Sequence, residues 1–264
     1  MKRVFAALLL ASLHPSRQAL TDLQVGSSQF ISYQDLLHLP QVSFTTSDDS
    51  NFSVPAKVAG VGLDQLKQAL HGEGDMVVAI CADGYRSNYP ASYLAAHRPV
   101  LVLTVDGKTQ EGWPKTHDGG PLGPYVIANP SFVPSFKVLS HVDEAQIPFQ
   151  VVRLDFRKES EVFGAIAPHG DFGPGSPAME GYTIAKQNCF RCHNMGGEGG
   201  QMASVPWPVL GAMAKGSPDF FAKYLRGPQA VNPRSRMAAS PQYDDQTMAA
   251  LEAYFSTFAA GGSK

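Results

Sequence analysis

The feature that most constrains the fold of this chain is a pentapeptide in its last third, Cys189-Phe190-Arg191-Cys192-His193. In a C-x-x-C-H pattern the two thiols can form thioether bonds with the vinyl groups of a heme, and the adjacent imidazole can reach the iron. A redox-active dithiol or half of a zinc site also contains C-x-x-C, but no second Cys or His pair follows at zinc-ligand spacing. The motif therefore predicts one covalent heme c, bound through Cys189 and Cys192, with His193 as an axial ligand of the iron.

Length and composition indicate two folded modules. The chain has 264 residues, of which 44% are hydrophobic and 17% charged, so it can bury a substantial core and is longer than one average domain. Its formal net charge is -2, and no run of Lys or Arg exceeds two residues. Nothing here favours binding to nucleic acid.

The N-terminus is typical of an export signal. An apolar stretch, 4–13, follows Lys2 and Arg3, and about ten apolar residues are too few to span a bilayer, which needs roughly twenty. We expect a signal peptide over 1–19, cleaved after Ala19, and hence a periplasmic protein without a transmembrane span. An uncleaved short anchor is the alternative. Export agrees with the heme motif, because c-type heme is attached outside the cytoplasm.

The residues around the motif predict helices. Ser176-Pro177 and Ser217-Pro218 each combine an N-cap residue with Pro at the first helical position, and the second of these helices ends at Gly227-Pro228. A last helix follows Asp244-Asp245. Its apolar residues recur at spacings of three and four: Met248, Leu251, Phe255 and Phe258.

This region resembles the class I cytochromes c, and we assign 176–264 to such an all-α domain. In that family a Gly and an aromatic residue, here Gly181-Tyr182, allow the first and last helices to cross closely. The family also places an axial Met in the loop before the last helix, which points to Met237, although Ala238 stands where the family usually has Pro. Met202 is the second candidate, Met195 and Met213 are further thioethers, and Met248 is more simply a core residue. The remaining alternative is that Met237 only packs and the distal position is open or held by another residue.

The region 20–158 predicts a mostly β, α+β module. Short apolar runs bounded by Gly, Pro, Asn and Asp are typical of strands, and two segments favour short helices. The expected strands are 76–80, 100–105, 125–128 and 149–156, and the expected helices are 63–70 and 91–97. Residues 159–175 are rich in Gly and Pro, so we expect a linker there.

Three segments of this module resemble the molybdopterin-binding domain of the sulfite oxidase family. They are 58–63, the turn from Cys81 to Arg86, and 119–122. The resemblance implies that Cys81 is the thiolate that binds molybdenum. However, Gly123 replaces a family Arg, Gly84-Tyr85 replaces an Asn-Arg pair, and residues 21–173 hold ten Lys and Arg against seventeen Asp and Glu, which disfavours a pyrophosphate pocket. We therefore favour a cofactor-free relative in which Cys81 is a small buried residue.

These observations favour an exported c-type cytochrome that transfers single electrons, with the sulfite-oxidase-like module docking a redox partner protein or positioning the heme. Ligation by His193 and Met237 leaves no vacant iron position and suits electron transfer. The partner could belong to a larger respiratory or photosynthetic complex. The alternative is a molybdenum-pterin oxidoreductase, similar to sulfite dehydrogenase, fused to its cytochrome acceptor. A third reading is a heme sensor with a displaceable Met237.

Overall fold

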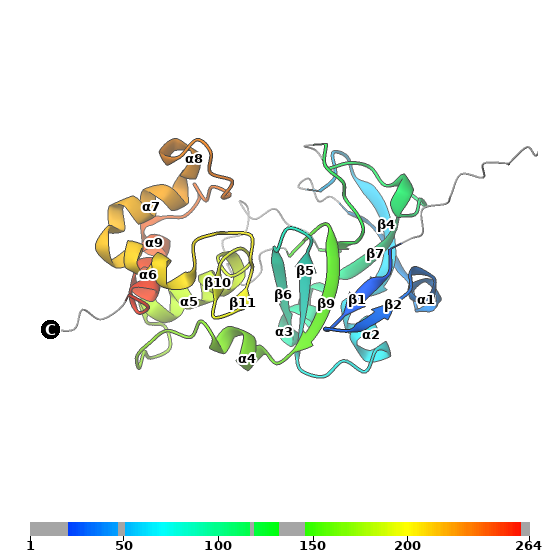
Figure 1. The fold of residues 1–264 in the computed structure, drawn as a ribbon, viewed down its shortest axis with the longest axis horizontal. Coiled ribbons are helices and arrows are strands. Elements are labelled where there is room, and N and C mark those ends of the chain that lie inside the picture. The colour runs from blue at the N-terminus through cyan, green and yellow to red at the C-terminus, as the bar shows by residue number, and fades with distance from the viewer. Residues whose placement is uncertain (1–20, 47–50, 117–118, 132–145, 260–264) are drawn as a thin grey trace, which may run out of the picture.

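The computed structural model describes residues 21–46, 51–116, 119–131 and 146–259. A strand-rich N-terminal module and a helical C-terminal module lie side by side (Figure 1). The expected signal peptide, 1–19, lies outside the described residues. Within those ranges, no helix is long and apolar enough to cross a membrane.

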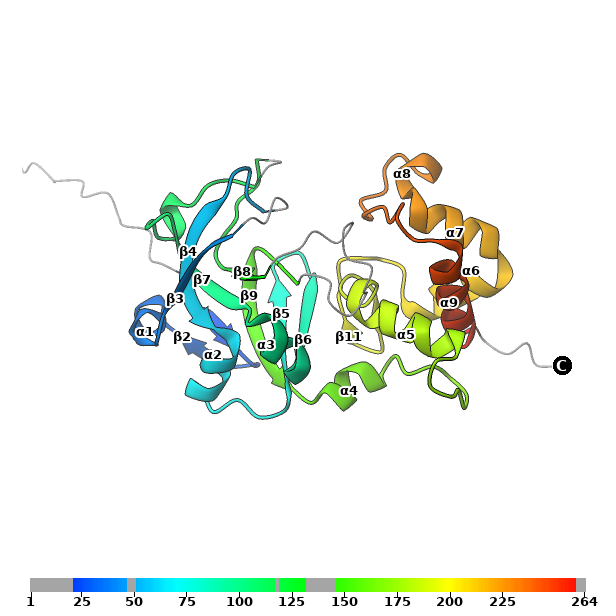
Figure 2. The same ribbon diagram turned by 180° about the vertical axis from the view of Figure 1, so that it is seen from behind.

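The N-terminal module contains two sheets. The first has five strands in the order β2-β1-β9-β5-β6, with β1 and β9 parallel and the other pairs antiparallel. Strand β6 forms one edge of this sheet, and Figure 2 shows that this edge faces the helical module. The strands are β1 (Leu23–Val25), β2 (Gln29–Ile31), β5 (Met76–Cys81), β6 (Arg86–Pro90) and β9 (Val151–Arg157).

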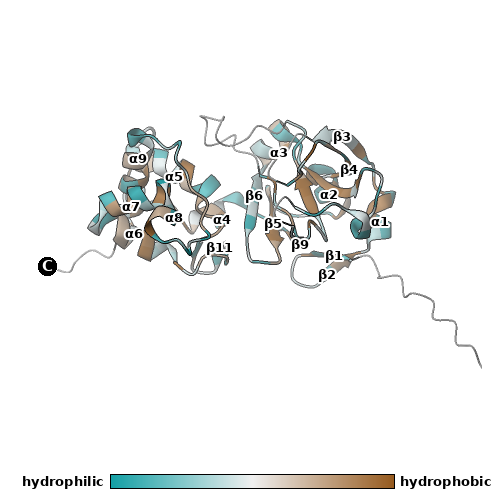
Figure 3. Cartoon of the chain, turned by 90° about the horizontal axis from the view of Figure 1, so that it is seen from above, coloured by the Kyte–Doolittle hydropathy of each residue, from teal (hydrophilic) through white to brown (hydrophobic). Residues whose placement is uncertain are grey.

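The second sheet has four antiparallel strands in the order β3-β4-β7-β8. An apolar core joins it to the first sheet, and Figure 3 shows apolar strands inside the module. The remaining elements are β3 (Val42–Thr46), β4 (Ala56–Gly62), β7 (Val100–Val105), β8 (Val126–Ala128), α1 (Tyr33–His38), α2 (Leu63–Ala69), α3 (Ala91–His97) and the short 3-10 helix η1 (Gln110–Gly112).

Strand β5, which lies between β9 and the edge strand β6, contributes to two cores. Val77, Ala79 and Cys81 belong to the core of the N-terminal module, whereas Met76 and Val78 belong to a cluster that contains the core of the helical module. Alternate side chains of a strand point to opposite faces, so a run without polar residues is the pattern of a strand covered on both sides. The continuous apolar sequence of β5 thus reflects one face against each module.

The regular structure of the C-terminal module is helical apart from one hairpin. Its two strands, β10 (Asn194–Met195) and β11 (Glu198–Gly199), have two residues each. Helices α5 and α9 cross closely because Gly181 has no side chain at the crossing, where a Cβ would clash with the carbonyl of Ala250. Asp244 caps α9 by accepting a 2.8 Å hydrogen bond from the backbone N–H of Thr247. The helices are α5 (Pro177–Asn188), α6 (Trp207–Gly216), α7 (Pro218–Arg226), α8 (Pro228–Val231) and α9 (Asp245–Ser256).

The segment expected as a linker, 159–175, begins with an ordered helix, α4 (Glu159–Gly164). Val162, Phe163 and Ile166 are buried in the core cluster of the helical module. Two tyrosines of that module hold the segment by hydrogen bonds from their hydroxyls, Tyr182 to the carbonyl of Phe163 (2.9 Å) and Tyr254 to that of Ile166 (2.6 Å). The first part of this connection is therefore packed, because its apolar side chains complete the helical core.

The predicted architecture is confirmed: a strand-rich α+β module precedes a helical module. The expected strands correspond to β5, β7, β8 and β9, and the expected helices to α2, α3, α5, α7 and α9, with ends that differ by one or two residues. The Pro at the start of α5 and α7 is confirmed at the first turn, but neither Ser176 nor Ser217 makes a side-chain cap bond. The elements that were not predicted are the strands β1, β2, β3, β4, β6, β10 and β11, the helices α1, α4, α6 and α8, and the 3-10 helix η1.

Candidate functional site

The C-x-x-C-H motif forms a turn at the end of α5. The backbone N–H groups of Cys192 and His193 both donate to the carbonyl of Cys189, at 3.2 and 3.0 Å. This turn continues the helical path for one step beyond α5, so it brings both thiols and the imidazole close together. Cys189 and Cys192 do not form a disulfide, and both are half-buried. The structure therefore brings the three predicted heme-attachment residues into one turn.

The imidazole of His193 is oriented by one backbone contact. Its Nδ1 lies 2.6 Å from the carbonyl oxygen of Val205. A carbonyl oxygen can only accept, so Nδ1 carries the proton and donates it, and Nε2 is left with a lone pair. Burial lowers the pKa of His193 and outweighs the Val205 contact, which acts in the opposite direction. A neutral imidazole with a fixed tautomer is the form that ligates iron.

An apolar cluster surrounds this turn and supplies the low-dielectric environment that a heme needs. Phe190, inside the motif, is fully buried and makes an edge contact with Trp207, their ring centroids 5.4 Å apart. Trp207 in turn contacts Phe255 and donates a 3.2 Å hydrogen bond to Tyr254. Cys189, Met195, Met213 and Met237 pack against the same cluster as half-buried residues. These residues fit a covalently attached heme.

Met237 lies in a loop that two helices hold in place. Its carbonyl accepts a 2.8 Å hydrogen bond from Gln229 of α8, and its N–H donates to the hydroxyl oxygen of Ser235, at 3.3 Å. Tyr224 of α7 donates to the same hydroxyl, at 3.0 Å. A loop fixed in this way can present a thioether in one orientation. The assignment of Met237 as an iron ligand stays a prediction.

The other methionines occupy different places. Met248 is 3% exposed on α9 and belongs to the core, as predicted. The sulfur of Met202 lies 3.9 Å from that of Cys192, and the backbone nitrogen of Met202 lies beside Gly84 of the N-terminal module. Met202 therefore lies next to Cys192, at the boundary between the modules. The Met237 loop is held by residues of the helical module.

Cys81 lies at the end of β5 with its side chain in the N-terminal core. It is 5% exposed, and burial is the largest cause that raises the pKa of its thiol, followed by the nearby Asp83 and Cys192. A molybdenum ligand must be a thiolate, and this environment favours the thiol. Within the described residues, no group of three or more His, Cys, Asp or Glu is arranged to hold a metal ion.

The cation nearest in sequence to Cys81 does not serve an anionic cofactor. The guanidinium of Arg86 pairs with the carboxylate of Glu198 across the module boundary, at 3.3 Å. Phosphate recognition needs several unpaired cationic donors, and this one already has an anionic partner. The residues around Cys81 do not fit a molybdopterin.

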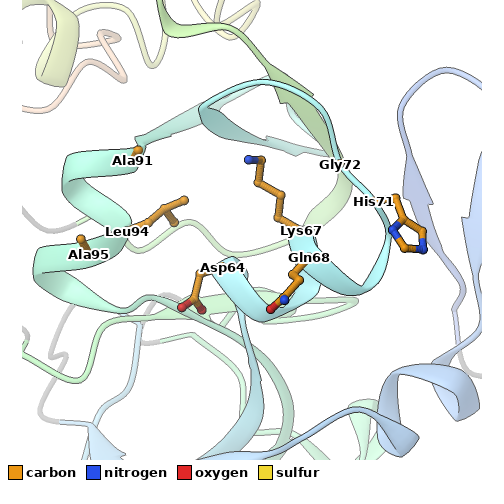
Figure 4. Close-up of a pocket in the computed structure, with 8 residues that line it drawn as sticks. All are labelled: Asp64, Lys67, Gln68, His71, Gly72, Ala91, Leu94 and Ala95. Atoms are coloured by element: carbon orange, nitrogen blue, oxygen red, sulfur yellow. The ribbon is translucent and has the colours of Figure 1, made fainter.

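Two open depressions on the surface lie elsewhere. The first, of about 480 Å³, lies between α2 and α3; Figure 4 shows Asp64, Lys67 and His71 on its α2 side and Leu94 on its α3 side. The second, of about 490 Å³, is lined by residues of α7 and α8 that include Lys223 and Arg226. Neither is lined by Cys81 or by the C-x-x-C-H turn, so neither is the site described here.

The sequence analysis did not find the residues that orient this site from outside the motif. Val205 acts through its backbone carbonyl, which any residue provides, so its type carries no signal. Gly199 adopts a φ of +90°, and a Cβ there would clash with the carbonyl of His193 and the ring of Phe190. The Gly196-Gly197 and Gly199-Gly200 pairs were the only available hint that the chain passes close to itself here.

Comparison with known proteins defines the class of the helical module. A family model described as Cytochrome c matches residues 178–259, so this part of the chain is a cytochrome c domain. The family implies covalently bound heme c and heme-based electron transfer. The chain has no significant match among curated proteins.

The N-terminal region resembles one solved structure in particular. This is the crystal structure of the sulfane dehydrogenase SoxCD from Paracoccus pantotrophus, with 16% sequence identity and a TM-score of 0.36. The match covers 53% of this chain and 38% of that one, so the chain spans well under half the length of the SoxCD chain it matches.

Proposed function

We propose that this protein is an exported c-type cytochrome that passes single electrons to and from a redox partner protein. The heme is attached through Cys189 and Cys192, and its iron is ligated by His193 and Met237. When bound, the heme supplies a one-electron redox couple. The N-terminal module positions the heme or docks the partner.

One observation carries this proposal. His193 follows the two thiols on one turn, and the Val205 carbonyl fixes its tautomer so that Nε2 is free to ligate iron. A redox dithiol has no use for an oriented imidazole at that position, and a zinc site would need further ligands nearby. Among the described residues no such ligand cluster exists.

The chain's own residues define the chemistry that the site can perform. The aromatic cluster around Phe190 and Trp207 excludes water, which keeps the reduced and oxidised forms of a bound heme in the same coordination and lowers reorganisation. Hydrogen bonds from Gln229 and to Ser235 hold the Met237 loop, so Met237 would be the second residue to ligate the iron of a bound heme. Ligation by both His193 and Met237 would leave no position for oxygen or peroxide, which favours electron transfer over catalysis at iron.

The compartment and partner follow from the sequence and its chemistry. Covalent heme attachment outside the cytoplasm and the apolar segment 4–13 both support a periplasmic location. Residues 174–264 hold eight Lys and Arg against six Asp and Glu, whereas residues 21–173 carry an excess of seven acidic groups. This asymmetry supports electrostatic docking of a partner, with association that weakens as the ionic strength rises.

The test is expression of the full chain in a bacterium that matures c-type cytochromes in its periplasm. We expect about one covalent heme per chain in the periplasmic fraction, with a low-spin spectrum in both redox states. Cys189→Ala and Cys192→Ala should each leave one thioether, and His193→Ala should abolish the low-spin spectrum. Cys81→Ala is the matched control and should attach heme normally. A chain that acquires no covalent heme in this host would contradict the proposal.

A molybdenum oxidoreductase is the second candidate because Cys81 lies close enough to the heme-attachment turn that Cys192 contributes to the raised pKa of the Cys81 thiol. Molybdenum and iron contents measured on the same purified sample separate the candidates. Iron near one per chain without molybdenum, from cells able to make the cofactor, supports the electron carrier.

A further inference from the structure

Several hydrogen bonds between the two modules converge on the heme-attachment loop, defined here as residues 189–203. The backbone N–H of Arg86, at the start of the edge strand β6, donates to the carbonyl of Arg191, at 2.9 Å. The N–H of Gln201 donates to the carbonyl of Gly84, at 2.8 Å. Both ends of the loop are thus hydrogen-bonded to one turn of the N-terminal module. Figure 1 shows β6 and β11 on facing sides of the boundary between the modules.

Side chains reinforce these backbone bonds. The guanidinium of Arg86 donates to the carbonyl of Gly199, at 3.0 Å, and to the carboxylate of Glu198, at 3.3 Å. The side chain of Arg86 is only 9% exposed, so this ion pair is largely shielded from water. Arg157 of β9 contacts the other oxygen of the same carboxylate, at 2.8 Å. Glu198 is therefore held by two strands of the N-terminal sheet.

One of the two residues between the heme-attaching cysteines, Arg191, takes part as well. Arg191 donates to the hydroxyl of Tyr85, at 3.3 Å. The chain approaches itself so closely here that a Cβ on Gly200 would clash with the carbonyl of Arg191. The loop cannot shift on its own without breaking contacts to Gly84, Tyr85 and Arg86, because these contacts lie on both sides of Cys192.

We propose that Arg86 is a positioning residue for the heme: through Glu198, Gly199 and Arg191 it holds the heme-attachment loop on the N-terminal sheet, so that the reduction potential of the heme depends on the N-terminal module. The turn from Cys81 to Arg86, which a molybdenum enzyme would use for its metal, serves here to hold the heme loop. The inference rests on the proposed function and adds a role for the N-terminal module within it.

The physical reason is the sensitivity of a heme to its surroundings. Water near the heme favours the ferric form, which carries one more positive charge than the ferrous form, and so lowers the reduction potential. With the loop held on the N-terminal module, the part of a bound heme near Cys192 would be shielded from water. Releasing the loop admits water there, and removal of a buried guanidinium also favours the ferric form. Both effects lower the potential.

The experiment compares the full-length holoprotein with four variants: Arg86→Met, Arg86→Lys, Tyr85→Phe and the control Lys57→Met. Lys57 is an exposed cation on β4, in the other sheet, so its removal changes the net charge equally without touching the loop. Two quantities are measured for each protein, namely the hydrogen exchange of the Gln201 amide and the reduction potential of the heme. Exchange reports local opening of the loop.

Loss of a hydrogen-bonded charge pair corresponds to about a tenfold change in an opening equilibrium, so Arg86→Met should speed exchange of the Gln201 amide about tenfold. Its potential should fall, whereas Lys57→Met should change neither quantity. Arg86→Lys keeps the charge but lacks the planar fork that reaches Glu198 and Gly199 together. We expect it to speed exchange as Arg86→Met does, and to lower the potential by less, because only the release of the loop then acts.

Several results would overturn the inference. If exchange rises while the potential stays constant, the contact is structural only. If Arg86→Lys keeps the natural potential and exchange while Arg86→Met does not, charge alone acts and positioning is wrong. If Arg86→Met does not fold, Tyr85→Phe, which removes a single hydroxyl, decides by the same two measurements with smaller changes in the same directions. A chain without heme refutes the proposed function, and exchange of the Gln201 amide still shows whether Arg86 holds the loop.

Discussion

Gly181 of α5 and Ala250 of α9 approach so closely that a single methyl group on Gly181 would overlap the carbonyl of Ala250 and the side chain of Tyr254. This contact sets the crossing of the two helices that enclose the heme-attachment turn. Because α5 ends directly at Cys189, any separation of the helices also displaces the turn.

We predict that Gly181→Ala destabilises the protein by about 3 kcal/mol, because the added methyl group forces the helices apart in a packed core. Urea unfolding of the holoprotein measures the change. Gly216→Ala, at the end of α6, is the control, since a Cβ there meets nothing within 4 Å, and it should be neutral or slightly stabilising. Equal effects of the two substitutions would contradict the close crossing.

Met237→Ala should remove the soft axial ligand. We expect the reduction potential to fall by on the order of 0.1–0.3 V, since a thioether favours ferrous iron, and we expect carbon monoxide to bind the reduced variant readily. Met202→Ala is the matched control. It should keep the natural spectrum and should not bind carbon monoxide readily. If Met202→Ala shows these changes instead, the ligand assignment is wrong. Rapid binding of carbon monoxide to the unsubstituted protein would favour a heme sensor.

Cys81→Ser should retain covalent heme and its potential while lowering the free energy of unfolding by about 1–3 kcal/mol, because the hydroxyl is more costly than the thiol to bury among apolar side chains. Heme absorbance, metal content and urea unfolding are measured together. Cys81→Ala separates the cost of a polar group from the cost of lost packing. Molybdenum present in the natural protein and lost from Cys81→Ser would make Cys81 a metal ligand after all.

Alkaline pH should destabilise the protein partly through Tyr254. Burial raises the pKa of its hydroxyl, which remains protonated in the folded state. In the unfolded state the same group ionises near pH 10, so the unfolded state binds fewer protons above that pH and stability falls as pH rises, by up to about 1.4 kcal/mol per unit for this group.

Tyr254→Phe tests this dependence. The variant should be less stable at pH 7, because Tyr254 donates to the carbonyl of Ile166 and accepts from Trp207, but its stability should fall less steeply between pH 10 and 11. Unfolding followed by tryptophan fluorescence at each pH gives the slope. An unchanged slope would mean that Tyr254 already ionises in the folded protein.

The elements that sequence predicts are those whose pattern is local. The apolar spacing after Asp244 predicts α9, and the motif at 189–193 predicts the heme turn, because each depends on residues a few positions apart. Strand β6 has the sequence Arg-Ser-Asn-Tyr-Pro, without the alternation of a half-buried strand. It is nevertheless buried throughout, because tertiary contacts rather than strand propensity determine its burial.

The contacts that position the site are predicted least well, since they join distant parts of the chain. Arg86 and Glu198 are 112 residues apart, and neither belongs to a motif that specifies the other. Gly and Pro residues between 164 and 175 indicate a linker, yet Val162, Phe163 and Ile166 are buried. Their helix has only six residues, which is too short to produce a recognisable apolar periodicity in the sequence. The sequence predicts the chemistry of the heme turn but not what holds it.

Because β5 presents one row of side chains to each module, neither module can be exchanged alone without uncovering apolar side chains. A gene fusion that supplied a different cytochrome domain would leave Met76 and Val78 without their partners, and a cytochrome domain freed from its own sheet would expose the surface that covers them. We expect such recombinants to be poorly soluble even though they retain a heme-attachment motif, because an apolar surface is exposed. The pair of modules is therefore expected to have changed in step, with substitutions on one side of β5 answered in the helical core.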